Sequence, residues 1–397
     1  MKRFAALSPL LTPLAAIALA IALLAANPFI WVNAALASVF QAGPKEAKIE
    51  RLYQDPSTAD LSTGERPAEA LASLASAWAS HPVADRTVLI GNSQMLSIVL
   101  APGESPVDGL RTYPDLLGEQ YLPWASRREA HYRLAAGNIS YMEALWYVEY
   151  LLTVPELRPS HLILQLNYES MRKLGIRDGM LGLLAHPPFL AAVTRIAASA
   201  EPHSAVFAQA LARWRSAGPA AEPRKRKPSA QTAADLAETR SRAALASFAP
   251  WDSRHSVKRE FLTSLYLLRV HLLRIKPTTR RPLSGATLTM SSSSLDAIAR
   301  ACAAHGIRLS VFNAPQNPAT PLYASERDRK TYSAILDRFR QVHHVPVYDF
   351  ENAIPARCWG RWIDGSDPIH FGRAGHERMA HLFLSSGILS ETRHAVQ

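Results

Sequence analysis

The chain of 397 residues carries 44 Lys and Arg against 33 Asp and Glu, a formal net charge of +11, and 48% of its residues are hydrophobic. This composition excludes a disordered chain, and the length suffices for one large domain, or one domain with a long insertion, around a full core. The basic excess indicates an anionic partner: a nucleic acid, a membrane surface or an acidic polymer.

The N-terminal segment decides among these partners. Residues 4–26 contain no charged side chain and follow two cations. About 20 apolar residues span a bilayer as a helix, and the cations place the N-terminus in the cytoplasm. We therefore expect residues 1–40 to form a single anchor in the cytoplasmic membrane, with the rest of the chain outside. A cleaved signal peptide is the alternative, because residues 35–37 read Ala-Leu-Ala, the small-x-small form of a cleavage site. Either way, export excludes nucleic acid and favours lipid headgroups or anionic envelope polymers.

The segments after the anchor alternate between the two regular structures. Gly, Pro and charged residues predict a tether at 41–66. A helix is expected at 67–80, and further helical segments separate short aliphatic runs bounded by turn residues. Strands that alternate with helices predict a parallel sheet covered on both faces, an α/β fold. The runs predict strands at residues 87–90, 161–166, 308–312 and 345–350, with a weaker one at 131–134.

One long interval breaks this alternation. Residues 178–290 contain helix-like apolar stretches around the solvated run EPRKRKP. We expect a helical, basic insertion here, which divides the main domain into a first part at 67–177 and a second part at 291–397. The two cysteines, Cys302 and Cys358, either pair or stay free, and neither has the C-x-x-C spacing of a metal site. No metal and no cofactor is expected.

The stretch RTVLIGNSQMLS, residues 86–97, ends a predicted strand on Gly91, Asn92 and Ser93. Ligands of an open parallel sheet bind beyond the carboxyl ends of its strands, so Ser93 stands where a nucleophile is expected. Gly91 permits a tight turn, and a helix that begins near Gln94 would direct backbone N–H groups at an anion formed on the substrate. An ordinary turn is the alternative, since Gly-Asn-Ser is common turn composition.

A base for this serine is found in WIDGSDPIHFGRAGHERMAHLF. Asp367 and His370 are expected in a loop between the last predicted strand and a helix beginning near Gly375. A carboxylate beside an imidazole fixes its tautomer and stabilises the imidazolium that forms when the ring takes a proton. This loop and Ser93 are expected at the same edge of the sheet. Asp364 is the alternative carboxylate.

The blocks VLIGNSQ, AAGNISYMEAL, LILQLNYES and DPIHFGRAGHERMA resemble, in order, those of the SGNH (GDSL-type) hydrolase superfamily, from about residue 86 to the C-terminus. The resemblance implies a three-layer sandwich with a mostly parallel sheet, which the helical insertion interrupts. It implies Ser93 as the nucleophile of an acyl-ester enzyme, with Asp367 and His370 completing the triad.

The resemblance also implies an oxyanion hole. Its donors would be the backbone N–H groups of Ser93 and Gly137 and the side chain of Asn167. Asn92 stands where the family usually has Asp and is a further candidate for oxyanion or substrate binding. The third block keeps only the Asn of the family's Gly-x-Asn-Asp. A strand-end Asn that caps a turn is therefore the alternative for Asn167.

The layout of anchor, first block, helical middle and closing block looks like the envelope-acylation members of that superfamily, of the D-alanyl transfer (DltD) and polysaccharide O-acetylation type. It implies transfer of an acyl group, through an acyl-enzyme on Ser93, to or from an envelope glycan or lipid, beside a multi-spanning membrane-bound O-acyltransferase. Two alternatives stay open: an esterase that releases the acyl group to water, and a non-catalytic partner that keeps the fold.

Overall fold

The computed structural model describes residues 67–80, 85–99, 101, 103–104, 111–118, 129–216, 282–320, 324–362 and 365–389. The predicted anchor, tether and basic run lie outside these residues. Within them, no single helix has the length and composition of a membrane span, although η4 (Asp178–Ala185) and α9 (Pro187–Ala197), bent by 119°, pass that test as a pair.

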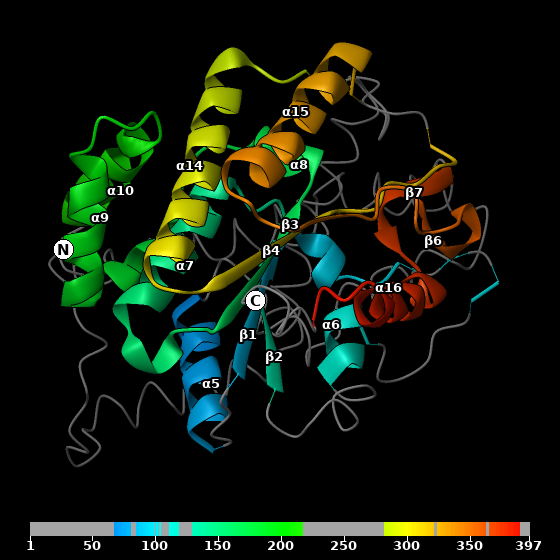
Figure 1. Ribbon diagram of the computed structural model, residues 1–397, viewed down its shortest axis with the longest axis horizontal. Helices are drawn as coiled ribbons and strands as arrows, with labels where there is room; N and C mark the ends of the chain where they lie inside the picture. The colour runs from blue at the N-terminus through cyan, green and yellow to red at the C-terminus, as the bar shows by residue number, and fades with distance from the viewer. Residues whose placement is uncertain are drawn as a thin grey trace, which may run out of the picture. The chain divides into compact units, whose positions relative to one another are not determined.

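Five parallel strands form the central sheet (Figure 1). They confirm the α/β expectation, because a strand occurs at each predicted position and every neighbouring pair is parallel. The order in the sheet is β2-β1-β3-β4-β5. The strands are β1 (Asp85–Gly91), β2 (Glu129–Ala135), β3 (His161–Leu166), β4 (Arg308–Asn313) and β5 (Val347–Asp349).

Helices cover both faces of the sheet, which gives three layers. Successive strand residues point to opposite faces, so Val88 and Ile90 pack in one apolar cluster and Leu89 in the other. The first face is covered by α5, α7, α14 and α15, and the second by α6 and α16 (Figure 1). The helices are α5 (Pro67–Ser80), α6 (Tyr113–Leu116), α7 (Tyr141–Thr153), α8 (Tyr168–Met171), α9, α10 (Ser204–Ser216), α14 (Gly285–Ala304), α15 (Glu326–Val342) and α16 (Arg373–Ser385), with short 3₁₀ turns η1 (Ser93–Met95), η3 (Pro155–Leu157), η4 and η5 (Ala356–Cys358).

The described start of the predicted insertion is helical and belongs to the main core. Phe189 of α9 meets Trp146 of α7 edge to face, with ring centroids 5.1 Å apart. Phe207 of α10 lies against the same indole at 5.5 Å. At the far end, α14 continues across residue 290, where the second part of the domain was expected to begin. The insertion's boundaries stay predictions.

The two cysteines are buried free thiols. Cys302 belongs to the apolar cluster on one face of the sheet and Cys358 to the cluster on the other. Burial raises the pKa of the Cys302 thiol to about 12, so this group stays protonated at neutral pH.

One expectation about the last segment is wrong. The residues around Asp367 and His370 form a strand, not a loop: β7 (Gly365–Phe371) pairs antiparallel with β6 (Trp359–Trp362). Helix α16 then begins at Arg373, earlier than expected. A distant contact holds this strand in place, because the Val99 N–H donates to the Phe371 carbonyl at 2.9 Å.

Candidate active site

Ser93 lies in the first turn after β1, at the carboxyl edge of the sheet. Asn92 is extended and caps the turn η1, with its side-chain oxygen accepting the Gln94 N–H at 2.9 Å. Gly91 ends β1 at a crowded point, because a Cβ there would lie 2.8 Å from the Met95 sulfur and closer still to the Gln165 side-chain oxygen. A larger residue at this position would have to displace those two side chains from beside the serine.

His370 bridges Ser93 and Asp367. Its Nε2 lies 3.0 Å from Ser93 Oγ, and its Nδ1 lies 3.0 Å from Asp367 Oδ2. An ionised carboxylate can only accept hydrogen bonds, so Nδ1 carries the proton of the neutral ring and Nε2 is left to accept the Ser93 hydroxyl. The structure thus brings together the three residues predicted as the triad, from elements 277 residues apart in sequence.

Asp367 is held as an ionised, fixed acceptor. Burial raises its pKa, but hydrogen bonds from the His370 ring and from the backbone N–H groups of Ile369 and His370 outweigh burial and leave the pKa below its usual value. Those backbone bonds reach Asp367 Oδ1 at 2.7 and 2.9 Å. The carboxylate is 2% exposed. It is therefore positioned to orient the imidazole at neutral pH.

Two backbone N–H groups beside the serine are available to an anion. Gly91 pairs with Ala135 in register, so Ser93 and Gly137 each lie two residues beyond the paired ends of β1 and β2. The Ala136 N–H donates to the Gly91 carbonyl at 3.1 Å and joins the two turns. Among the described residues, no acceptor engages the N–H of Ser93 or of Gly137. Free backbone donors beyond two neighbouring strand ends are what an oxyanion hole requires.

The side chain of Asn167 is engaged elsewhere. It caps α8, accepting the Ser170 N–H at 2.8 Å and donating to Ser170 Oγ at 3.0 Å. The geometry is that of the strand-end cap, the alternative that the third block left open. As a third oxyanion donor, Asn167 stays a prediction that would require it to leave Ser170. Asp364 lies outside the described residues.

Sequence reasoning missed the buried amides that surround the triad. Asn317, 1% exposed, donates to the Asp367 backbone carbonyl at 2.8 Å. Gln165 and Gln94 form a second set of buried contacts. The available signal was Gln165 itself, a polar side chain inside the otherwise apolar strand LILQL.

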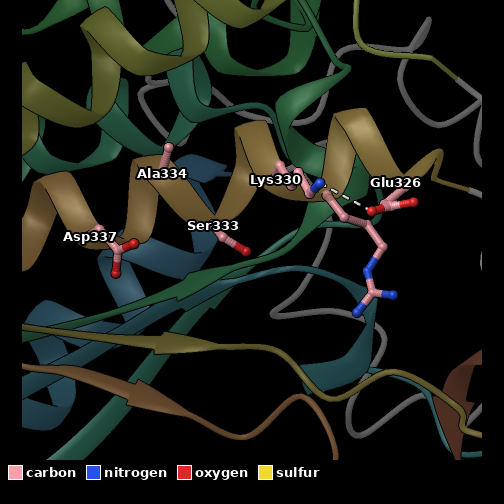
Figure 2. A pocket seen from close by; sticks show the side chains of 6 residues that line it. Glu326, Lys330, Ser333, Ala334 and Asp337 are labelled. Carbon is pink, nitrogen blue, oxygen red and sulfur yellow. Dashed lines mark ion pairs between the residues drawn. The ribbon is translucent and has the colours of Figure 1, made fainter.

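A hollow of about 340 Å³ lies along α15 (Figure 2). Its lining comes from one helix alone, and Lys330 and Glu326 form an exposed ion pair across it at 3.1 Å. None of the lining residues belongs to the elements that carry Ser93, Asp367 and His370. Within the described ranges, no three His, Cys, Asp or Glu residues gather as they would around a metal ion.

No protein-family model and no curated protein matches the chain. Solved structures resemble it at low identity. One is an alpha/beta hydrolase enzyme from the metagenome of Lake Arreo, Spain, with 12% identity, a TM-score of 0.36 and coverage of 78% of this chain and 98% of that one. A GDSL-like lipase from Bacteroides thetaiotaomicron has 9% identity, a TM-score of 0.33 and coverage of 79% and 97%. The native aryl esterase of M. smegmatis has 12% identity, a TM-score of 0.32 and coverage of 77% and 99%.

Proposed function

We propose that this chain is a serine-dependent acyl-ester enzyme of the SGNH (GDSL-type) kind. One observation carries the proposal: the unbroken chain of contacts from Asp367 through His370 to Ser93, with both heavy-atom distances at 3.0 Å. A nucleophile within hydrogen-bond reach of a base, and a base oriented by a third group, is the arrangement that activates a serine.

The reaction follows from these positions. Ser93 Oγ attacks the ester carbonyl while its proton moves to His370 Nε2, and the N–H groups of Ser93 and Gly137 receive the charge on the carbonyl oxygen. The bond from the acyl carbon to the alcohol oxygen then breaks, and His370 returns the proton to the departing alcohol. An acyl group stays on Ser93. A second hydroxyl or water, deprotonated by His370, removes it and restores the serine.

We further propose that the enzyme works outside the cytoplasmic membrane, held there by residues 1–40, and that it prefers transfer over hydrolysis. The apolar N-terminal run and the net charge of +11 support this location, since anionic lipids or polymers would attract the chain. The acceptor would be a hydroxyl of an envelope glycan or lipid, and a membrane-bound O-acyltransferase would be the partner that supplies or receives the acyl group.

Fluorophosphonate labelling tests the nucleophile. The purified wild-type protein is expected to become labelled, and Ser93→Ala to lose at least about 100-fold of the labelling rate, because the probe phosphonylates only an activated serine. Ser97→Ala is the matched control: this serine follows four residues later in the same segment and should leave labelling unchanged. Equal labelling of wild type and Ser93→Ala would remove Ser93 from the role.

Mass analysis of envelope glycans and lipids tests the place and the acceptor. If the enzyme is a transferase, cells that carry only Ser93→Ala are expected to lack one ester that wild-type cells possess. If it is an esterase, the same cells would accumulate that ester. Comparable expression of the variant, judged by immunoblot, is the control. An unchanged envelope together with full biological activity would favour the non-catalytic partner.

A further inference from the structure

We propose that Gln94 and Gln165 form a buried chain of amides that sets the distance between Ser93 and His370, and that both are positioning residues for the reaction. The inference rests on the proposed function and deepens it. It gives a positioning role to two side chains that do not belong to the triad and do not touch the substrate in the proposed reaction.

The contacts run in one direction across the site. The Asn92 N–H donates to the side-chain oxygen of Gln165 at 2.8 Å. The Gln165 amide nitrogen donates to the side-chain oxygen of Gln94 at 2.6 Å. The Gln94 amide nitrogen then donates to two carbonyls, that of Pro315 at 3.0 Å and that of Ile369 at 2.8 Å. The chain therefore links the turn after β1, the strand β3, the segment after β4, and β7.

Both ends of this chain adjoin the reacting groups. Asn92 and Gln94 flank Ser93, and Ile369 directly precedes His370. Consecutive Cα atoms stand about 3.8 Å apart, so a shift of the Ile369 peptide moves the imidazole with it. Loss of about 1 Å in alignment at a reacting centre can cost about 100-fold in rate. The amide chain is thus placed to control the distance between Ser93 Oγ and His370 Nε2.

Because both glutamines are buried, few other side chains can satisfy the same hydrogen-bond partners. Gln94 is 3% exposed and Gln165 is 2% exposed. Gln94 uses both of its amide hydrogens and its oxygen, so no other residue type of that length satisfies all three partners. Glutamate has the same shape but no donor, and its oxygens would face the carbonyls of Pro315 and Ile369. A buried carbonyl that loses its donor destabilises the fold around it.

A buried hydrogen bond elsewhere in the same sheet separates positioning from stability. His161 Nε2 lies 2.9 Å from Ser310 Oγ, and both side chains are fully buried. This pair joins β3 to β4 near the start of the strands, where His161 stands opposite Arg308. Ser310→Ala therefore removes a comparable buried contact without touching the carboxyl edge.

The experiment compares Gln94→Met, Gln94→Glu, Gln165→Leu and Ser310→Ala in the full-length protein, with p-nitrophenyl acetate as substrate and urea unfolding as the measure of stability. The glutamine variants are expected to lower kcat by about 10-fold to 100-fold with KM within about twofold, and to slow fluorophosphonate labelling of Ser93 by a similar factor. The double variant Gln94→Met/Gln165→Leu should lose no more kcat than the worse single variant, because either substitution alone already interrupts the same chain of hydrogen bonds. Ser310→Ala should lose stability but keep kcat.

Three results would overturn the inference: glutamine variants that keep kcat, glutamine variants that raise KM alone, or a Ser310→Ala variant that loses as much kcat as they do. If Gln94→Met does not fold, Gln165→Leu carries the same test, because it breaks the chain one contact earlier. Ser93→Ala is the arm that isolates the underlying function. Full activity in Ser93→Ala would reject the serine mechanism itself, whereas an inactive Ser93→Ala beside unaffected glutamine variants would reject only the positioning role.

Discussion

His370→Ala is expected to lower kcat for ester cleavage by about 10⁴-fold to 10⁶-fold, because no other base stands beside the Ser93 hydroxyl in the described structure. Asp367→Asn should lower kcat by about 10⁴-fold, because it changes the tautomer of the His370 ring. The Asn amide would donate to His370 Nδ1, which forces the ring proton onto Nε2 and removes the acceptor that Ser93 needs. Steady-state kinetics with p-nitrophenyl acetate measure both losses.

His305→Ala is the control for these variants, since this histidine is exposed at the end of α14. It should keep wild-type kcat. KM should change little in His370→Ala and Asp367→Asn, because the interactions they remove act in the transition state. Activity within tenfold of wild type in His370→Ala would show that another group serves as base and would overturn the assignment.

Much of the sheet was predictable because its strands are buried on both faces. Runs such as HLILQL and the segment around Val88 are apolar on successive residues, which is the pattern of a parallel sheet between helices. The hairpin β6–β7 was not predictable. It contains Gly360, Pro368 and several polar residues, and it forms where Gly360 packs against Val99, more than 250 residues earlier in the sequence. Tertiary packing of this kind leaves no local signal.

The residues of the site also fall into two groups, those that the sequence predicts and those that it does not. The grouping of Ser93, Asp367 and His370 was predictable from the order of the blocks that carry them along the sequence, since Gly-Asn-Ser alone is common turn composition. The amide chain was not, because Gln94 bonds to carbonyls 221 and 275 residues away, and a carbonyl is present at every position whatever the side chain. Gln165 was visible as a polar residue in an apolar strand, but the sequence around it does not show which groups its amide contacts.

Acid should destabilise this fold through His376. Burial lowers the pKa of this ring to about 3, outweighing the hydrogen bond with the Ser97 carbonyl and the nearby Asp115 carboxylate, which raise it, while His370 and Arg133 lower it further. The ring is neutral, and both nitrogens are in use: Nδ1 accepts the Tyr113 N–H at 3.1 Å, and Nε2 donates to Ser97 at 3.2 Å. Protonation of Nδ1 would leave the Tyr113 N–H without its acceptor and would place a charge in the core.

The sign follows from proton uptake. The unfolded chain binds a proton at His376 below a pKa of 6.5, whereas the folded chain does not until about 3, so between these values the unfolded state holds more protons and stability falls as the pH falls. Going from about pH 7.5 to about pH 4.5 should cost about 3 kcal/mol of unfolding free energy at this site, at about 1.4 kcal/mol for each unit below the unfolded pKa. Urea unfolding at the two pH values measures it. His376→Gln should be less stable at the higher pH yet lose about 3 kcal/mol less on acidification, and His305→Ala should behave as wild type. An equal acid loss in wild type and His376→Gln would mean that other groups, with the carboxylates foremost, set the acid limit of the fold.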